Sequence, residues 1–336
     1  MASACGGIDL GGTKIQCVIV DERQKVLGSA RAPTPTEGGP ADVAAAMAGA
    51  LREAATDAGI KDTSTLAGIG VGSPGAVDEK AGTVSGAGNL PDWAASFPLG
   101  PTLAKALGTT VAIGNDVGVA TDAELALGAG RGVSSLIGVF WGTGVGSGII
   151  LDRKPWHGRG AAGEIGHTVV KMGGRRCLCG RRGCLEAYSG RAAMEARARK
   201  LHREGKPTDL FKLMSKHDRT RLTSSIWARA LERKDGLARQ LIDEAIEALG
   251  AGIASAVNLL DVEMVVIGGG LGVRLGQPYV ERIETAMKPH LFVDERPPAV
   301  RLAELGDLGG AIGASLLVDP PKPAPKRRQT TPAASS

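Results

Sequence analysis

Glycine clusters separate short apolar runs along much of this chain, and they restrict its possible folds more than any other feature. The sequence holds 50 glycines in 336 residues. Glycine is favoured where the backbone must turn sharply or approach a ligand closely. Helical patterns alternate with the apolar runs. This alternation is typical of α/β folds, in which ligands bind where strands end and glycine turns begin.

Both halves of the chain carry the same pattern, because each contains two strand-like runs that flank a glycine turn. The charged segment 200–234 is expected to be mostly helical and to decorate the surface. The other predicted elements are a hairpin over 6–20, a helix over 41–58, a strand over 66–72, a strand pair over 136–151, a helix over 237–253 and a strand over 264–267.

Composition indicates an ordinary globular protein, with 43% hydrophobic and 22% charged residues, and the length favours two domains. The net charge is +5, but the stretch from Pro320 onward contributes four basic residues and no acid, so the remainder carries 5 − 4 = +1. No nucleic-acid partner is therefore expected. The proline-rich tail is predicted to be disordered, with contact to a polyanion as the alternative.

The location of the protein is predicted to be cytoplasmic, because the first residues lack the pattern of a secretion signal. The longest uncharged stretch, 136–151, is too short for a membrane span and is interrupted by glycines, so no membrane partner is expected. Without a secretion signal, the five cysteines favour a metal site or free thiols over disulfides.

Two glycine loops are candidates for binding phosphate, since closely spaced glycines let backbone N–H groups reach phosphate oxygens. Asp9, at the start of the first loop, could hold Mg²⁺ indirectly. Each loop alone is equally compatible with a simple hairpin turn, whereas two loops together suggest a phosphate chain held between them. The candidate residues are Asp9, Gly11, Gly12, Thr13 and Lys14 in the first loop, and Gly142, Thr143, Gly144 and Gly146 in the second.

Asp116 is the candidate catalytic base, because it directly follows the apolar run 111–113 and should lie at the end of a strand. Phosphoryl transfer to an alcohol requires a positioned acceptor for the hydroxyl proton, and a carboxylate can serve. The alternative is that Asp116 only caps a helix beginning near Val117.

A metal site is predicted from one histidine and three cysteines, His167, Cys177, Cys179 and Cys184, which fall within 18 residues. This set fits a tetrahedral Cys₃His zinc site. Four protein ligands leave no open coordination position, so the zinc should be structural. The alternative is a buried histidine beside unrelated free thiols.

The run G-E-I-G-H-T-V-V-K-M-G-G-R-R-C-L-C-G-R-R-G-C-L-E resembles the signature of the ROK family, named for repressors, open reading frames and kinases. Further similar motifs are D-L-G-G-T-K, G-V-G-S-P-G-A-V-D, N-L-P-D-W, N-D, G-T-G-V-G-S-G and G-G-G-L. The resemblance covers residues 6–318. It implies an α/β fold of two actin-like and hexokinase-like (ribonuclease H-like) domains with an active-site cleft between them.

The resemblance also places the domains. The small domain would span 1–115 and the large domain 116–318, with a final helix near 309–318 packing back on the small domain. The tail would span 319–336. The family further implies a homodimer or a homotetramer as the working form.

The activity implied is phosphorylation of a hexose by ATP with Mg²⁺, and glucose is the expected acceptor, as in glycolysis. Asp116 would be the base. By similarity, the sugar would contact Gly75, Ala76, Asn89, Asn115, Asp116, Glu164, His167 and Glu186. The adenosine side would be lined by Gly268, Gly269 and Gly270, and the zinc ligands would be those named above.

Other acceptors remain open, namely mannose, fructose, N-acetylglucosamine and N-acetylmannosamine, and polyphosphate is an alternative donor. Two non-enzymatic readings also exist. A sugar-sensing repressor of this family would carry a DNA-binding domain ahead of the first loop, where this sequence has eight residues before Asp9. A catalytically inactive sugar-binding protein would be expected to lose Asp116 or a glycine loop. Gly114 and the segment 117–119 depart from the usual family pattern, which bears on the shape of the pocket.

Overall fold

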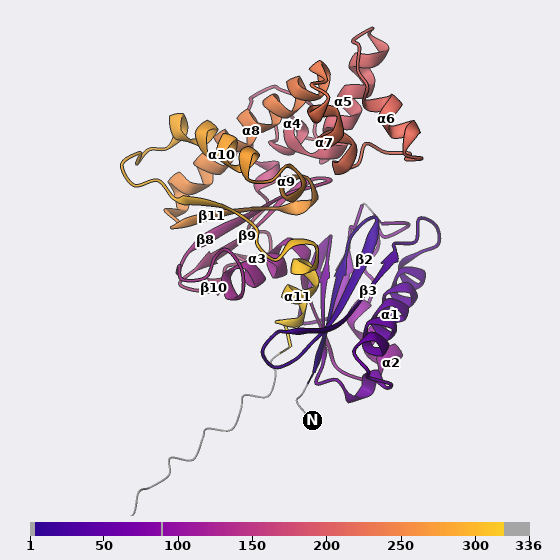
Figure 1. Ribbon diagram of the computed structural model, residues 1–336. Helices are drawn as coiled ribbons and strands as arrows, with labels where there is room; N and C mark the ends of the chain where they lie inside the picture. The colour runs from indigo at the N-terminus through magenta and orange to yellow at the C-terminus, as the bar shows by residue number, and fades with distance from the viewer. Residues whose placement is uncertain (1–3, 89, 319–336) are drawn as a thin grey trace, which may run out of the picture.

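The computed structural model describes residues 4–88 and 90–318. Within this part of the chain the elements form two bodies, each built on a five-stranded sheet (Figure 1). The first sheet has the order β3-β2-β1-β4-β7 and the second the order β10-β9-β8-β11-β12. Asn89 and the tail from 319 lie outside the described residues, so the predicted disorder of the tail is not addressed.

The two sheets share one topology. In the first, β1 (Cys5–Leu10), β2 (Lys14–Val20) and β3 (Val26–Pro33) are antiparallel, and β4 (Ile69–Ser73) and β7 (Val111–Asn115) extend β1 in parallel. In the second, β8 (Leu136–Trp141), β9 (Val145–Leu151) and β10 (Lys154–Pro155) are antiparallel, and β11 (Met264–Gly268) and β12 (Ala299–Leu302) extend β8 in parallel. The predicted hairpins and the α/β class are confirmed.

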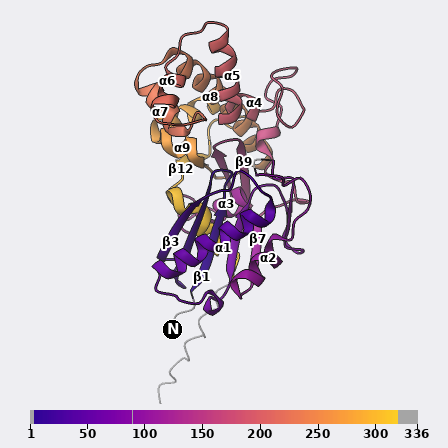
Figure 2. The same ribbon diagram turned by 90° about the vertical axis from the view of Figure 1, so that its right-hand side faces the viewer.

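Helices cover both sheets. On the first, α1 (Pro40–Asp57) and α2 (Leu99–Leu107) lie on one face and α11 (Gly309–Ser315) on the other (Figure 1). A small hairpin of β5 (Ala76–Asp78) and β6 (Thr83–Ser85) follows β4. Figure 2 shows the two bodies stacked along one long axis. The remaining helices are α3 (Asp116–Ala126), α4 (Glu186–Ser189), α5 (Arg191–Arg203), α6 (Leu210–Lys216), α7 (Ser224–Glu232), α8 (Gly236–Leu260), α9 (Gly269–Leu275) and α10 (Gln277–Met287).

Strand glycines allow α11 to lie directly on the first sheet. A side-chain carbon on Gly7 would overlap the carbonyl oxygen of Ala311, and one on Gly70 would overlap the carbonyl oxygen of Ala314. This close approach joins the C-terminal helix to strands near the start of the chain. The domain bounds given above stay a prediction.

The segment 200–234 is helical as expected, but its assignment to the surface is wrong. Leu210 and Trp227 are fully buried in the core of the second body, together with Leu213, Leu222 and Ile226. Their apolar positions face inward because α6 packs against α7, and α7 in turn packs against α8 and α9. The charged residues between them mask this pattern in the sequence. None of the described helices combines the length and the apolar character required to cross a membrane.

Glu124 in α3 joins the two chain segments that run between the bodies. Its buried carboxylate, 3% exposed, accepts the Ala129 N–H at 2.8 Å and the Glu304 N–H at 3.1 Å through Oε2, and the Leu305 N–H at 3.0 Å through Oε1. Ala129 lies on the way from α3 to β8, and the other two residues lie between β12 and α11. One side chain therefore satisfies three backbone donors from two connections.

Replacing Glu124 should test this junction. Glu124→Ala leaves three backbone N–H groups without their acceptor, so we expect the free energy of unfolding to fall by about 3 kcal/mol. Glu124→Gln keeps one oxygen acceptor and should lose less. The exposed Glu37 provides the control, and Glu37→Ala should change stability by less than about 0.5 kcal/mol. Urea denaturation of the three variants measures this order, and equal stability of Glu124→Ala and the control would contradict it.

Candidate functional site

The first glycine loop and Asp116 lie at one edge of the first sheet. The parallel strands β1, β4 and β7 end there, with Asp9 paired to Gly72 and Ser73 paired to Asn115. Asp116 follows β7 immediately as the first residue of α3. The turn at Gly75 follows β4 at the same edge and has a φ of +93°, a conformation that favours glycine.

Asn115, and not Asp116, is the N-cap of α3. Its Oδ1 accepts the backbone N–H of Gly118 at 3.2 Å. The Asp116 carboxylate accepts the N–H of Val117 at 2.9 Å and sits at the first turn of the helix. The capping alternative for Asp116 is therefore wrong, because the preceding residue already fills that position.

Burial, together with the nearby carboxylates of Asp9 and Glu164, raises the pKa of Asp116 to about 7 against the opposing effect of the Val117 N–H. Burial likewise raises the pKa of Asp9 to about 6, against the lowering effect of Lys14. Asp9 belongs to the first sheet, whereas Glu164 precedes the short helix η2 (Ile165–His167) beside β9 of the second. Asp116 is therefore influenced electrostatically by one carboxylate from each body. The raised pKa values of Asp9 and Asp116 make these two carboxyl groups suited to proton transfer.

The first glycine loop closes through Gly11, whose N–H donates to the Lys14 carbonyl at 2.9 Å. The Lys14 ammonium donates to Gln16 Oε1 at 3.0 Å and lies 3.5 Å from Asp307 Oδ1. Gly12 and the exposed Thr13 form the tip of this turn. Asp307 is in η4 (Gly306–Leu308), directly before α11, so the loop is also held from the C-terminal end of the chain.

The second glycine loop lies at the corresponding edge of the second sheet, between β8 and β9. The Gly142 N–H donates to the Gly144 carbonyl at 2.9 Å, which makes the turn tight. Because β11 runs parallel to β8 and ends opposite Phe140, the turn over 268–270 lies beside this loop. A side-chain carbon on Gly142 would stand 3.8 Å from the Gly270 nitrogen. The structure therefore brings the two predicted glycine segments of the second body together.

Glu186 contacts the second glycine loop. Its Oε2 accepts the Val145 N–H at 2.9 Å, and its carboxylate occupies the space that a side chain on Gly144 would need. Glu186 begins α4 two residues after Cys184. The cysteine segment is thereby connected to the glycine loop through one short helix.

The four predicted metal ligands come together. Their ligand atoms all lie within 4.8 Å of one another. Cys179 Sγ is 3.7 Å from Cys184 Sγ, and Cys177 Sγ is 3.8 Å from His167 Nδ1. A tetrahedral zinc with Zn–S bonds of about 2.3 Å holds its ligand atoms about 3.8 Å apart, so this spacing fits the ion.

The orientation of His167 places it between two groups. Its Nδ1 faces Cys177, and its Nε2 lies 3.9 Å from Glu164 Oε2. The segment that carries Glu164 is fixed on β9, where both the N–H and the hydroxyl of Ser147 donate to the Gly163 carbonyl. The cysteine cluster and the carboxylate group around Asp116 are therefore parts of one continuous arrangement.

Arg191 belongs to this region although the sequence analysis did not select it. Its Nη2 donates to Thr143 Oγ1 in the second glycine loop at 2.7 Å. The signal available in the sequence was its position, because the dipeptide Ser189-Gly190 marks a chain turn directly after the cysteine signature.

Of the predicted site residues, Asn89 lies outside the described residues.

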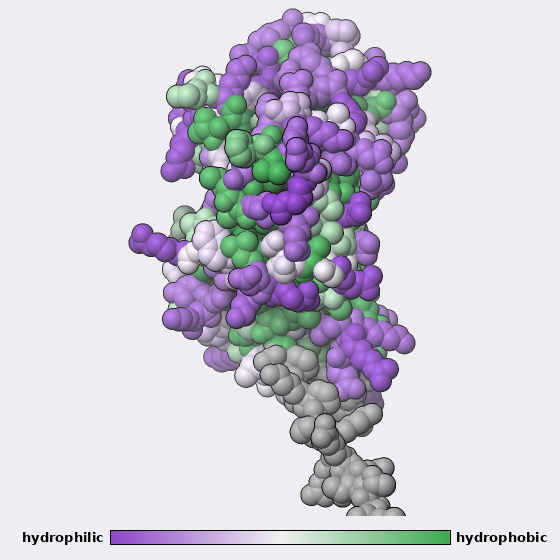
Figure 3. All heavy atoms as spheres, turned by 90° about the vertical axis from the view of Figure 1, so that its left-hand side faces the viewer, coloured by the Kyte–Doolittle hydropathy of each residue, from purple (hydrophilic) through white to green (hydrophobic). Residues whose placement is uncertain are grey.

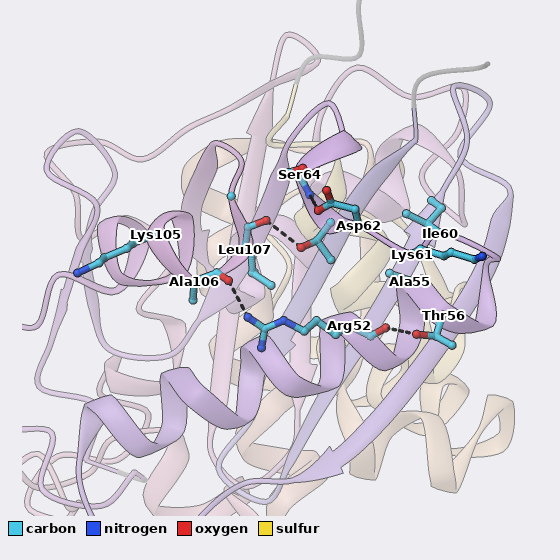
Figure 4. Close-up of a pocket in the computed structure, with 12 residues that line it drawn as sticks. Arg52, Ala55, Thr56, Ile60, Lys61, Asp62, Ser64, Lys105, Ala106 and Leu107 are labelled. Atoms are coloured by element: carbon cyan, nitrogen blue, oxygen red, sulfur yellow. Dashed lines mark hydrogen bonds between the residues drawn. The ribbon is translucent and has the colours of Figure 1, made fainter.

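A hollow of about 480 Å³ lies elsewhere, on the first body (Figure 4). Residues 60–64 and 105–108 line it and precede β4 and β7, so it opens at the sheet edge opposite to Asp9 and Asp116. Arg52 Nη2 donates to the Ala106 carbonyl at 2.6 Å, and Thr63 Oγ1 donates to the Leu107 carbonyl at 2.8 Å. These bonds terminate α2 and account for the polar lining.

Comparisons with known proteins agree with this architecture. The family model described as ROK family matches residues 5–320. The chain is 31% identical to a glucokinase of Thermotoga maritima, covering 91% of this chain and 95% of that protein, and 31% identical to an N-acetylgalactosamine kinase of a Shewanella species, covering 93% and 95%. The crystal structure of a ROK family glucokinase from Streptomyces griseus in complex with glucose and AMPPNP is 30% identical and superposes with a TM-score of 0.81, covering 94% of this chain and 99% of that chain. This chain belongs to the ROK family.

Proposed function

We propose that this protein is an ATP-dependent sugar kinase, and specifically a glucokinase that converts glucose to glucose 6-phosphate. The observation that carries the proposal is the position of Asp116, at a strand end between the two bodies and among the carboxylates of Asp9 and Glu164. The glucokinase from Thermotoga maritima and the glucose and AMPPNP complex from Streptomyces griseus support the same substrates.

In the proposed reaction, Asp116 accepts the proton of the attacking sugar hydroxyl. A group whose pKa lies near the working pH is effective in this task, because it is largely ionised and still basic. Directional acceptors and donors for the other hydroxyls would come from carboxylate, amide and imidazole groups. By resemblance to the family, these groups belong to Asn89, Asn115, Glu164, His167 and Glu186, and the backbone of Gly75 and Ala76 would lie close to the same sugar.

The two glycine loops are proposed to hold the phosphates of ATP, with the turn over 268–270 beside the adenosine. Mg²⁺, held indirectly through Asp9, would neutralise charge on the phosphate oxygens. In the second loop the Val145 N–H is already bonded to Glu186. The Gly142 N–H is bonded to the Gly144 carbonyl, so the proposed phosphate contacts there would come from the remaining N–H groups of the loop and from the Thr143 hydroxyl.

Zinc is proposed as the ion held by His167, Cys177, Cys179 and Cys184. Its contribution would be structural, since the four ligands complete a tetrahedral shell. It would fix the segment that carries Glu164 and Glu186 on either side of the cysteines. The imidazole would bind zinc through Nδ1 and leave Nε2 toward the sugar.

The runner-up function is phosphorylation of another hexose or an N-acetylhexosamine. The Shewanella relative acts on N-acetylgalactosamine, and it is as similar to this chain as the Thermotoga glucokinase is. Sugars that differ in one hydroxyl are distinguished by the fine shape of the pocket. Polyphosphate as donor, a cytoplasmic location and a homodimer or homotetramer stay predictions.

A panel assay tests the proposed function directly. Purified protein should release ADP with glucose, ATP and Mg²⁺, and less rapidly with mannose, fructose, galactose and the N-acetylhexosamines. Polyphosphate replaces ATP in a parallel series, with formation of the sugar phosphate measured in place of ADP. A higher kcat/KM with an N-acetylhexosamine than with glucose would favour the runner-up, and no transfer to any sugar would refute both.

Asp116→Asn should lower kcat by about 10²–10⁴ while the KM values for glucose and ATP change little, because the variant loses the base but keeps the shape. In the wild type, Asp116 becomes protonated as the pH falls through about 7, so kcat/KM for glucose should decrease below that pH. Steady-state kinetics from pH 5 to 9 measures both effects.

Asp122 offers a matched control for Asp116. It lies on the same helix, and burial followed by repulsion from Glu79 raises its pKa to about 7 as well. Asp122→Asn should keep the wild-type pH profile. A normal kcat in Asp116→Asn, or loss of the low-pH decline in Asp122→Asn, would remove Asp116 from its proposed role.

We expect one zinc per chain by elemental analysis. Cys179→Ser should lower the zinc content and the melting temperature, because the tetrahedral shell loses a ligand. Cys5 is buried in the first body, away from the cluster, and Cys5→Ala should leave the zinc content unchanged. Purified wild-type protein without metal would contradict the assignment.

A further inference from the structure

Arg191 stands at the junction of three segments of the second body. It is the first residue of α5, and its guanidinium lies between the second glycine loop and the chain that leads into α7. Nη2 donates to Thr143 Oγ1 at 2.7 Å, and Nη1 donates to the Leu222 carbonyl at 2.9 Å. The two donor arms therefore connect the loop to a segment about 80 residues away in the sequence.

The backbone at this junction fixes the same loop. The Arg191 N–H donates to the Gly142 carbonyl at 3.1 Å, and the Ala192 N–H donates to the Thr143 carbonyl at 3.0 Å. The first turn of α5 thus holds the loop without any help from the guanidinium. The bond from the Arg191 guanidinium to the Thr143 hydroxyl is therefore additional to the two backbone bonds that attach the loop.

The chemistry of the two groups determines the direction of that bond. A guanidinium has only donors, whereas a threonine hydroxyl has one hydrogen and two acceptor positions. The Thr143 oxygen must therefore accept from Arg191, which leaves its single hydrogen free to be donated elsewhere. An anionic phosphate oxygen at the loop is an acceptor for this hydrogen, and charge-assisted bonds of this kind are strong.

The second donor of the guanidinium, Nη1, bonds to a segment near the turn over 268–270, the proposed adenosine side of the site. Leu222 directly precedes the Thr223-Ser224 start of α7, and the Ser224 hydroxyl lies 3.7 Å from the point where a side-chain carbon on Gly270 would stand. The Leu222 N–H is in turn held by Glu195 Oε2 at 3.0 Å. Arg191 therefore joins the two parts of the wall that face the nucleotide.

We propose that Arg191 is a positioning residue for the phosphoryl donor, which orients the Thr143 hydroxyl as a donor to a phosphate oxygen and adds positive charge beside the second glycine loop. This inference rests on the proposed kinase function and deepens it. Arg191 acts through Thr143 and not on the sugar. Its loss should accordingly affect nucleotide binding and leave sugar binding intact.

The test compares Arg191→Gln with the wild type in steady-state kinetics and in calorimetric binding of AMPPNP. Loss of a charged donor in a hydrogen bond corresponds to a change of about tenfold or more in a binding constant. We expect the KM for ATP and the Kd for AMPPNP to rise by about tenfold, while the KM for glucose changes less than twofold. Arg191→Lys keeps the charge and a donor and should recover part of the loss.

Thr143→Val is the second variant of the experiment. It removes the hydroxyl that Arg191 is proposed to orient, so Arg191→Gln should add little to the defect of Thr143→Val. Arg203→Gln, at the exposed end of the same helix, is the charge control and should bind AMPPNP as the wild type does. Independent, additive effects of the first two substitutions would overturn the proposed link.

A purely structural role for Arg191 predicts a different result. It would lower the melting temperature and raise the KM values for ATP and glucose together, and either that pattern or an unchanged Kd for AMPPNP would overturn the inference. The binding measurement separates this outcome from failure of the proposed function. If the wild-type protein binds AMPPNP but phosphorylates no sugar, the proposed kinase function is refuted and the binding measurement still tests the role of Arg191. If the wild-type protein does not bind AMPPNP, both the function and the role of Arg191 are refuted.

Discussion

Parallel pairing of strands fixes the positions of the glycine turns and of Asp116 at the candidate site. In each sheet the chain returns to pair in parallel, β4 with β1 and β7 with β4 in the first, and β11 with β8 and β12 with β11 in the second. Parallel strands end at the same edge, so the turns that follow them are brought together whatever their separation in sequence. The first glycine loop, Gly75 and Asp116 meet in this way in one body, and the second loop meets residues 268–270 in the other.

The cysteine cluster supplies what strand pairing cannot. Glu164 lies in irregular chain and Glu186 begins the single-turn helix α4, so no strand ladder holds the backbone of either residue. His167 and Cys184 belong to the ligand set and lie three and two residues away from these glutamates, and Glu186 is further tied to the Val145 N–H. A tetrahedral ion imposes fixed distances on its ligands, so it can position flanking side chains as firmly as a sheet does. The side of the molecule drawn in Figure 3 is mainly hydrophilic (purple) at its upper end, and hydrophobic residues (green) gather along the middle of the same side.

Sequence patterns predicted the features that depend on neighbours along the chain. The hairpins about both glycine loops, the long helix α8 and the cysteine spacing are local, and all are found in the structure. The pattern left open whether Asp116 is a base or only a helix cap, because Asp and Asn both cap well and only the structure shows that Asn115 occupies the cap position. Burial of Trp227 and the contact of Arg191 with Thr143 were missed for the same reason, since each depends on segments far apart in sequence.

Glu124 restricts how the two bodies can move relative to each other. The two bodies are joined by two stretches of chain, and a single carboxylate binds backbone donors from both. Two independent tethers would let the bodies twist and slide as well as swing. The two stretches are fastened together at Glu124, and α3 also packs against α11, so movement of the bodies relative to each other is restricted at this junction.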